Sequence, residues 1–168
     1  MRTNESSSAF TKSPRENEPF GPPLIGALLR MPWEAVQRQM LARLHERGFD
    51  DFDAAYLDVF QYPGPQGARP SELAARLRIS KQALNYLLGE LERLGYLERR
   101  QDPEDLRSKR IALTARGTSA ISVIREAVEE MEATWAQQLG SKRFAQLRDL
   151  LLDVNRRISA SDNAAPAE

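Results

Sequence analysis

The chain has 168 residues, of which 41% are hydrophobic and 29% charged, and its 24 Lys and Arg are balanced by 24 Asp and Glu. This composition is typical of a globular domain with a core of its own. The sequence contains no cysteine and a single histidine, which excludes a disulfide framework, a thiol redox site and a zinc–thiolate site, and leaves no histidine cluster for a metal. No apolar run reaches the length of a membrane span and the N-terminus lacks a signal core, so we expect a cytoplasmic protein with no metal, no cofactor and no membrane partner.

The two ends of the chain differ in composition from its middle. Residues 1–22 are rich in Ser, Asn, Glu and Pro and are expected to form a disordered arm, and residues 159–168 a disordered tail. Apolar residues at helical spacing predict helices over 24–47 and 52–61. Pro32 should kink the first of these helices or begin a new one, because proline removes an amide donor and clashes with the preceding turn.

A helix-turn-helix pattern follows the proline-rich segment 62–70. Ser71 is expected to cap a short helix, ELAARL, and Ser80 a longer one, KQALNYLLGELERLG, with a three-residue turn between them. The longer helix carries a stripe of leucines that predicts its buried face: Leu84, Leu87, Leu88, Leu91 and Leu94.

Two short strands and two long helices complete the pattern. The segments YLERR and KRIALT are typical of strands, joined by residues 101–108. Thr114 should cap a long helix and Ser141 the last one. Their apolar residues recur at three- and four-residue spacing over 118–138 and 142–158, the pattern of helices that pack along one another. The predicted fold is mainly α with a small two-stranded antiparallel β-wing: a winged helix-turn-helix flanked by N- and C-terminal helices.

The outward face of the longer helix has the chemistry of a DNA reader. The residues that we assign to DNA contact on it are Ser80, Lys81, Gln82, Asn85 and Tyr86. Gln and Asn can bond an adenine edge in two places, Lys can reach a guanine or a phosphate, and Tyr can bond a phosphate or touch a thymine methyl. The alternative is an ordinary solvated face, but residues 81–89 contain no acid. Gly89 either allows a close backbone approach or is merely tolerated there.

Positive charge is concentrated around this helix and the predicted wing. Residues 69–116 hold 11 Lys and Arg against 7 Asp and Glu, an excess of four, which the rest of the chain cancels. Arg107, Lys109 and Arg110 lie together at the tip and rising arm of the hairpin. Because a solvated turn needs no such cluster, we expect a polyanion to bind there; the alternative is a set of surface ion pairs.

The segment from Ser71 to Gly117 resembles the core of MarR-type transcriptional regulators. It carries the Ser-x-Leu-Ala helix, a recognition helix ending in Leu-x-x-x-Gly-Tyr-Leu-x-Arg, and the wing Asp-Pro-x-Asp-x-Arg-Ser-x-x-Ile-x-Leu-Thr-x-x-Gly. With the flanking helices the resemblance covers roughly residues 24–158. It implies that Arg107 reaches into the minor groove and is oriented by Asp105. Lys109 and Arg110 would then contact phosphates. A guanidinium is favoured in a narrow minor groove, where the phosphate field is concentrated.

The same resemblance implies a homodimer held by its terminal helices and a repressor that a small ligand releases. A two-fold dimer predicts a pseudo-palindromic DNA site with half-sites about one helical turn apart. The chain would divide into dimerisation segments at 23–50 and 117–158 around a DNA-binding domain at 51–116. The apolar spacing of the terminal helices supports a dimer independently, since one small winged domain cannot cover so many apolar residues; packing within one chain is the alternative.

Aromatic residues cluster where the resemblance places an aromatic or phenolic ligand: Trp33, Phe49, Phe52, Tyr56, Phe60 and Tyr62. Core packing is the alternative for each of them. His45 is interpreted as a polar surface residue. Arg78 stands at a turn where the family commonly has glycine, and the absence of cysteine excludes the thiol-oxidation switch of some relatives.

Two other functions stay open. A winged helix can serve as a protein-interaction module, although a protein-binding wing need not keep three cations together, and a regulator can act without a small-molecule effector. An enzyme would need a nucleophile–base pair or a metal set, and we identify no catalytic residue. We therefore expect a sequence-specific DNA-binding regulator and not an enzyme.

Overall fold

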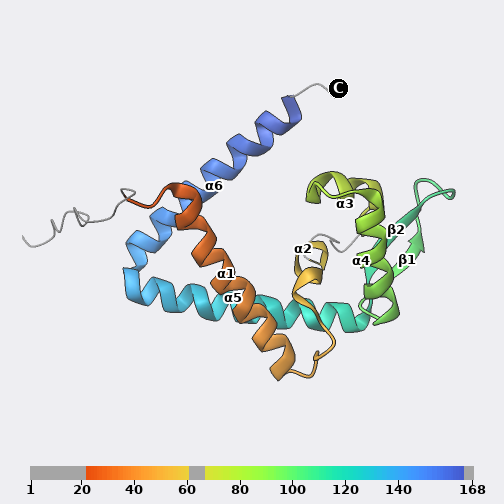
Figure 1. The fold of residues 1–168 in the computed structure, drawn as a ribbon, viewed down its shortest axis with the longest axis horizontal. Helices are drawn as coiled ribbons and strands as arrows, with labels where there is room; N and C mark the ends of the chain where they lie inside the picture. The colour runs from red at the N-terminus through yellow and green to blue at the C-terminus, as the bar shows by residue number, and fades with distance from the viewer. Residues whose placement is uncertain (1–21, 61–66, 165–168) are drawn as a thin grey trace, which may run out of the picture. The chain divides into compact units, whose positions relative to one another are not determined.

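The computed structural model describes residues 22–60 and 67–164, with side chains described as far as residue 160 (Figure 1). The chain divides into two compact units, residues 1–35 and 36–168. Its elements are α1 (Ile25–Glu46), a short 3-10 turn (Ala54–Tyr56), α2 (Leu57–Phe60), α3 (Pro70–Leu77), α4 (Lys81–Arg93), β1 (Leu97–Gln101), β2 (Lys109–Leu113), α5 (Ala115–Leu139) and α6 (Ser141–Ala164). The predicted fold class, mainly α with a two-stranded antiparallel wing, is confirmed. The predicted arm lies outside the described residues, apart from Pro22.

Helix α1 confirms the helix predicted over 24–47 and excludes one of the two alternatives given for Pro32. The helix is continuous from Ile25 to Glu46 and contains Pro32, so no new helix begins there. Proline inside a helix removes one bond, to the carbonyl four residues earlier, and good helix formers on both sides maintain the rest. In the described part of the first unit, six large apolar side chains are exposed: Leu24, Ile25, Leu28, Leu29, Met31 and Trp33.

The helix predicted over 52–61 is much shorter in the structure. The side chain of Asp53 accepts a hydrogen bond of 2.8 Å from the amide of Ala55 and starts the 3-10 turn, which continues into the four residues of α2. The three apolar residues of α2, Leu57, Val59 and Phe60, are fully buried. The segment is therefore a core-filling turn rather than a full helix.

Helices α3 and α4 form the helix-turn-helix. The predicted cap at Ser71 is wrong: α3 begins at Pro70, two residues before the predicted start at Glu72, and Arg69 is the cap residue. Proline is favoured at the first helical position. Arg78 ends α3 in the left-handed conformation, at φ 53°, which explains why glycine is common there. The predicted cap of α4 is confirmed, since the side chain of Ser80 accepts a bond of 3.1 Å from the amide of Ala83.

The wing is the hairpin of β1 and β2, paired from Leu97 opposite Leu113 to Gln101 opposite Lys109. A third segment joins it that the sequence did not predict. Ala68 and Ile111 exchange backbone hydrogen bonds of 2.9 and 2.8 Å, which tie the chain before α3 to the middle of β2. The base of the wing is thereby attached to the helix-turn-helix.

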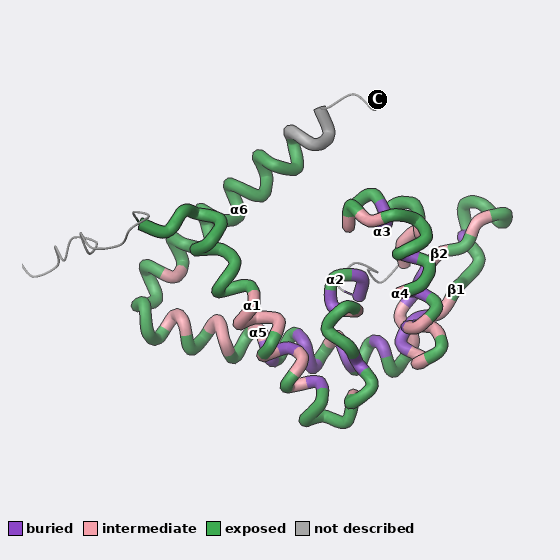
Figure 2. Tube along the Cα trace, in the orientation of Figure 1, coloured by how far each residue is buried: buried purple, intermediate pink, exposed green. Residues whose placement is uncertain are grey.

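The core lies where α2, α4, the wing and the first half of α5 meet (Figure 2). Thr114 caps α5 as predicted, accepting a bond of 3.0 Å from the amide of Gly117. Helix α6 begins at Ser141 itself, so the predicted cap at Ser141 is wrong, and none of the described side chains of α6 is buried. The helix continues to Ala164, beyond the predicted start of the tail, because no helix breaker occurs before Pro166.

Candidate nucleic-acid interface

Helix α4 buries one face and presents the other. Leu84, Leu88 and Leu91 are completely buried in the core. On the other side every residue that we assigned to DNA contact is exposed: Ser80, Lys81, Gln82, Asn85 and Tyr86. Gly89 is also exposed, and nothing lies within 4 Å of where its side chain would begin. Over residues 81–89 the helix therefore offers an outward face of donors and acceptors with no acid on it.

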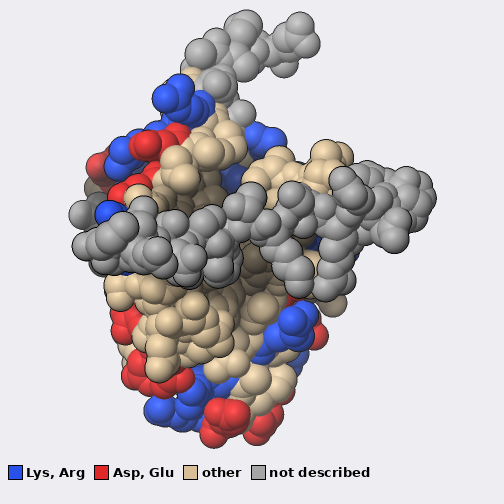
Figure 3. All heavy atoms as spheres, turned by 90° about the vertical axis from the view of Figure 1, so that its left-hand side faces the viewer, with Lys and Arg blue, Asp and Glu red and all other residues tan. Residues whose placement is uncertain are grey.

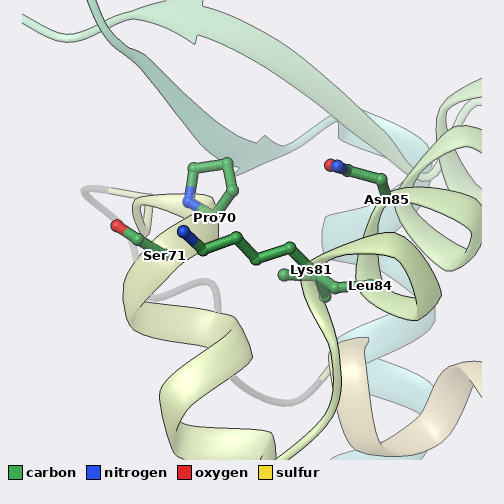
Figure 4. Close-up of a pocket in the computed structure, with 5 residues that line it drawn as sticks. All are labelled: Pro70, Ser71, Lys81, Leu84 and Asn85. Carbon is green, nitrogen blue, oxygen red and sulfur yellow. The ribbon is translucent and has the colours of Figure 1, made fainter.

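Two hollows flank the N-terminal half of α4. One has a volume of about 210 Å³ and is lined by Pro70, Ser71, Lys81, Leu84 and Asn85. In Figure 4 the side chain of Lys81 extends across this hollow toward Pro70 and Ser71 at the start of α3. The other hollow is lined by Ser80, Gln82, Ala83, Tyr86 and Leu87. The side chains assigned to DNA contact thus border concave surface on both sides of the helix.

The tip of the wing is a tight turn over residues 105–108. The amide of Ser108 donates to the carbonyl of Asp105 at 2.9 Å, which places Leu106 and Arg107 at the apex. The carboxylate of Asp105 accepts a bond of 3.0 Å from the backbone amide of Arg107. Asp105 thus orients the turn that carries Arg107. No bond from the Asp105 carboxylate to the Arg107 guanidinium is present, although the resemblance implied that Asp105 orients that side chain.

A buried carboxylate that sequence reasoning missed holds the base of this hairpin. Asp102 is completely buried and lies 2.7 Å from Nε of Arg69 and 3.0 Å from Nε of Arg110. Its carboxylate also accepts a hydrogen bond of 3.0 Å from the backbone amide of Glu104. Burial by itself would raise the pKa of Asp102, but the bonds from Glu104, Arg69 and Arg110 outweigh it and hold that pKa well below its usual range.

Most arginines around the wing are paired with acids. Arg110 is largely buried and contacts both Asp102 and Glu104, Arg99 contacts Glu92, and Arg100 contacts Glu98. Over the described part of residues 69–116, the charged side chains of three cations make no hydrogen bond or ion pair: Lys81, Arg107 and Lys109. These three are the cations that a polyanion meets without first breaking a contact within the protein.

Four of the aromatic residues assigned to a ligand pocket belong, with Tyr96, to one cluster of rings: Phe49, Phe52, Tyr56 and Phe60. Phe52 and Phe60 are completely buried, with ring centroids 5.1 Å apart, and Phe52 lies 5.1 Å from the ring of Tyr96. Phe49 and Tyr56 are half-buried at the edge of this cluster. Phe52 and Phe60 therefore fill core rather than line a cavity. Trp33 belongs to the first unit, and Tyr62 lies outside the described residues.

Tyr96 also joins a polar contact at the start of α5. Its hydroxyl donates to Asp51 at 2.6 Å, and Arg116 donates to the same carboxylate at 2.8 and 3.0 Å. The guanidinium of Arg116 lies 4.4 Å from the ring centroid of Tyr96. Burial, followed by the bond to Asp51, raises the pKa of the Tyr96 hydroxyl strongly. This contact joins three segments: the end of α4, the α1–α2 connection and α5. The side chain of His45 lies apart from this contact. It is exposed and lies 3.0 Å from the backbone carbonyl of Phe52.

Neither a metal cluster nor a membrane span is found in the described residues. No three His, Asp or Glu side chains there are grouped so that they could hold a metal ion. No helix in the same part of the chain combines the length and apolarity that crossing a bilayer requires.

Comparison with known proteins agrees with this geometry. Residues 59–108 match the model of the MarR family. An uncharacterized HTH-type transcriptional regulator, YkoM of Bacillus subtilis (strain 168), is 30% identical over 92 residues, which are 55% of this chain and 58% of that protein. The chain thus spans less than two thirds of this relative's length.

Solved structures extend the similarity to most of the chain. The crystal structure of a MarR family transcription regulator is 27% identical, with a TM-score of 0.61 over 84% of this chain and 89% of the other. A MepR variant of S. aureus bound to an oligodeoxyribonucleotide has a TM-score of 0.53 at 22% identity, over 82% of this chain and 99% of its own.

The structure has a capped recognition helix with an exposed polar face. Beside it lies an attached hairpin with cations near its tip. This arrangement defines the winged helix-turn-helix class, which DNA-binding transcription regulators use. Within that class this chain is similar to MarR-type winged-helix regulators, and the resemblance seen in the sequence is confirmed.

Proposed function

We propose that this protein is a sequence-specific DNA-binding regulator that acts as a homodimeric repressor on a pseudo-palindromic operator. The observation that carries the proposal is the joint exposure of the polar face of α4 and of Arg107 at the wing apex. The recognition helix would enter the major groove, where Gln82 and Asn85 reach base edges. Arg107 would enter the neighbouring minor groove, where the phosphate field favours a guanidinium.

The contacts within the protein indicate which cations of the proposed interface are available to bind DNA. Lys81 and Lys109 are exposed without an ion pair and are assigned to phosphates. Arg110 was assigned to a phosphate as well, but its contacts with Asp102 and Glu104 are better explained by support of the wing. Ser80 caps α4 with its hydroxyl, so its DNA contact would use the outward side of the same oxygen or the backbone.

A homodimer is supported by α6. Six of its large apolar side chains are exposed in the single chain: Leu147, Leu150, Leu151, Leu152, Val154 and Ile158. A patch of this kind on a globular protein marks an interaction surface. Where grey atoms do not cover the face in Figure 3, acidic and basic side chains are mixed with other residues.

Release by an aromatic or phenolic ligand is the last part of the proposal. Because Phe52 and Phe60 already fill the core, a ligand would contact the half-buried Phe49 and Tyr56 at the edge of the aromatic cluster. The matching test is loss of DNA binding on addition of simple phenols, with a Tyr56→Ala variant that should bind DNA and no longer respond.

The salt dependence of DNA binding tests the interface. The three unpaired cations in the described part of residues 69–116 give about six phosphate neutralisations per dimer, and hence a slope of log affinity against log salt of about −5. Fluorescence anisotropy with the duplex that flanks this protein's gene would measure the slope. Arg107→Ala should weaken binding and make the slope shallower by about 2, because a dimer loses two contacts.

A matched control separates the outcomes. Arg99→Ala removes a cation that is bound to Glu92 and should change the slope by less than half as much. If wild type shows only weak, sequence-blind binding and Arg107→Ala changes nothing, a random-sequence selection for bound DNA decides between a distant operator and a protein-interaction module. Recovery of no duplex would favour the module.

A further inference from the structure

The apex of the wing carries an apolar side chain that the proposed function leaves unexplained. Leu106 is 72% exposed. It occupies a central position of the turn over residues 105–108, where Gly, Pro, Asn, Asp and Ser are usual for conformational reasons. Within the described part of residues 51–116, the only large hydrophobic side chains that are exposed are Tyr86 and Leu106. Both lie on the two elements that would face DNA.

The turn holds Leu106 in place. Its carbonyl accepts a bond from the side chain of Gln101. The neighbouring amide of Arg107 bonds the Asp105 carboxylate, and the hydroxyl of Ser108 donates to the Asp105 carbonyl at 3.0 Å. Little further ordering is needed for Leu106 to make a contact, so burying it on a partner incurs a small entropic cost.

The minor groove offers an apolar side chain both a surface and a means of discrimination. Its walls are deoxyribose, and it is about 6 Å wide. Its floor is smooth over A·T pairs, whereas each G·C pair places the 2-amino group of guanine there. Apolar side chains, leucine among them, are used by other proteins as contacts and wedges in this groove.

We propose that Leu106 is a specificity-determining residue: it enters the minor groove beside Arg107, packs on the sugar walls and disfavours pairs that carry a 2-amino group. This inference rests on the proposed function, because it requires the wing to lie on DNA. It adds a readout that is independent of charge, since Leu106 releases no counterions. The wing would then read base composition by shape as well as by electrostatics.

The test uses the full chain and the best duplex from a random-sequence selection. Each adenine in turn is replaced by 2,6-diaminopurine, which keeps the major-groove edge of adenine and adds a 2-amino group to the minor groove. Wild type should lose about tenfold in affinity at the positions under the wing. Leu106→Ala should lose less than about threefold there, and on the unmodified duplex it should bind about tenfold more weakly with an unchanged salt slope.

Two variants serve as controls. Leu106→Met keeps the apolar volume and should stay within about threefold of wild type. Arg107→Ala should weaken binding with a shallower salt slope, which reports the proposed function separately. If Leu106→Ala matches wild type in affinity and in its response to 2,6-diaminopurine while Arg107→Ala still weakens binding, this inference is overturned and the proposed function is not. If wild type selects no duplex, both are overturned.

Discussion

Gly117 allows α5 to start against the end of α4, and replacing it by alanine tests whether that close approach is required. A Cβ added at Gly117 would lie 2.1 Å from the carbonyl oxygen of Tyr96 and 3.1 Å from Cδ2 of Leu113. The carbonyl of Tyr96 cannot easily move, because it accepts a hydrogen bond of 3.1 Å from the backbone amide of Thr114. Thr114 is also the residue that caps α5. The first turn of α5 must therefore shift away from the wing.

The size of the effect follows from two opposing contributions. Forcing extra atoms into a packed site costs about 1–3 kcal/mol, and a contact as short as 2.1 Å places Gly117→Ala near the upper limit. Alanine is better than glycine inside a helix by about 1 kcal/mol. The free energy of unfolding should therefore fall by about 2 kcal/mol, which in a chain of this length lowers the melting temperature by roughly 4–8 °C.

Gly89→Ala is the matched control. Gly89 lies inside α4, is exposed, and has nothing within 4 Å of the added Cβ. The same substitution should raise the free energy of unfolding by up to about 1 kcal/mol. Urea unfolding followed by circular dichroism, at one fixed protein concentration because a dimer's stability depends on it, measures both variants. A Gly117→Ala variant as stable as wild type would refute the reasoning.

Two further predictions concern polar contacts in the core. Tyr96→Phe removes the 2.6 Å hydrogen bond to Asp51, and a bond to a charged acceptor contributes about 1.5–3 kcal/mol. Because Asp51 keeps its bond to Arg116, we expect the free energy of unfolding in urea to fall by about 1.5 kcal/mol. An unchanged free energy of unfolding would show that Arg116 alone satisfies Asp51. The pKa of Asp102 is lowered by folding, so its contribution is complete above the unfolded value of about 3.9 and disappears as the pH falls toward the folded value. The difference in melting temperature between wild type and Asp102→Asn should therefore be constant from pH 7 to 5 and shrink below about pH 4; a difference that grows there would contradict the assignment.

Local patterns were sufficient to predict the elements that position the site. The caps at Ser80 and Thr114 were correct because each depends on a side chain and an amide three residues apart. Leucine spacing alone correctly predicted the burial of Leu84, Leu88 and Leu91, whereas Leu87 and Leu94 are half-buried. Such features require no knowledge of distant residues, so a single sequence contains them.

The contacts of the wing could not be predicted in the same way. Asp102 resembles a solvated turn residue in the sequence, and its burial depends on Arg69, 33 residues earlier in the chain. Asp105 could bond either its own turn or the Arg107 guanidinium, and the turn amide, two residues away, is the nearer donor. Long-range pairing decides the first case and local competition the second.

The charge of the wing could not be predicted from the sequence alone either, because it depends on which arginines are paired with acids. The local excess of four positive charges overstates what a polyanion would meet, because Arg69, Arg99 and Arg110 are each paired with an acid. These pairs hold the stem of the hairpin, and the turn over residues 105–108 holds its tip. A rigid stem and tip reduce the conformational entropy lost when the apex binds. In the proposed mode of binding, the arginines that lie away from the apex contribute indirectly, by fixing where Leu106 and Arg107 are presented.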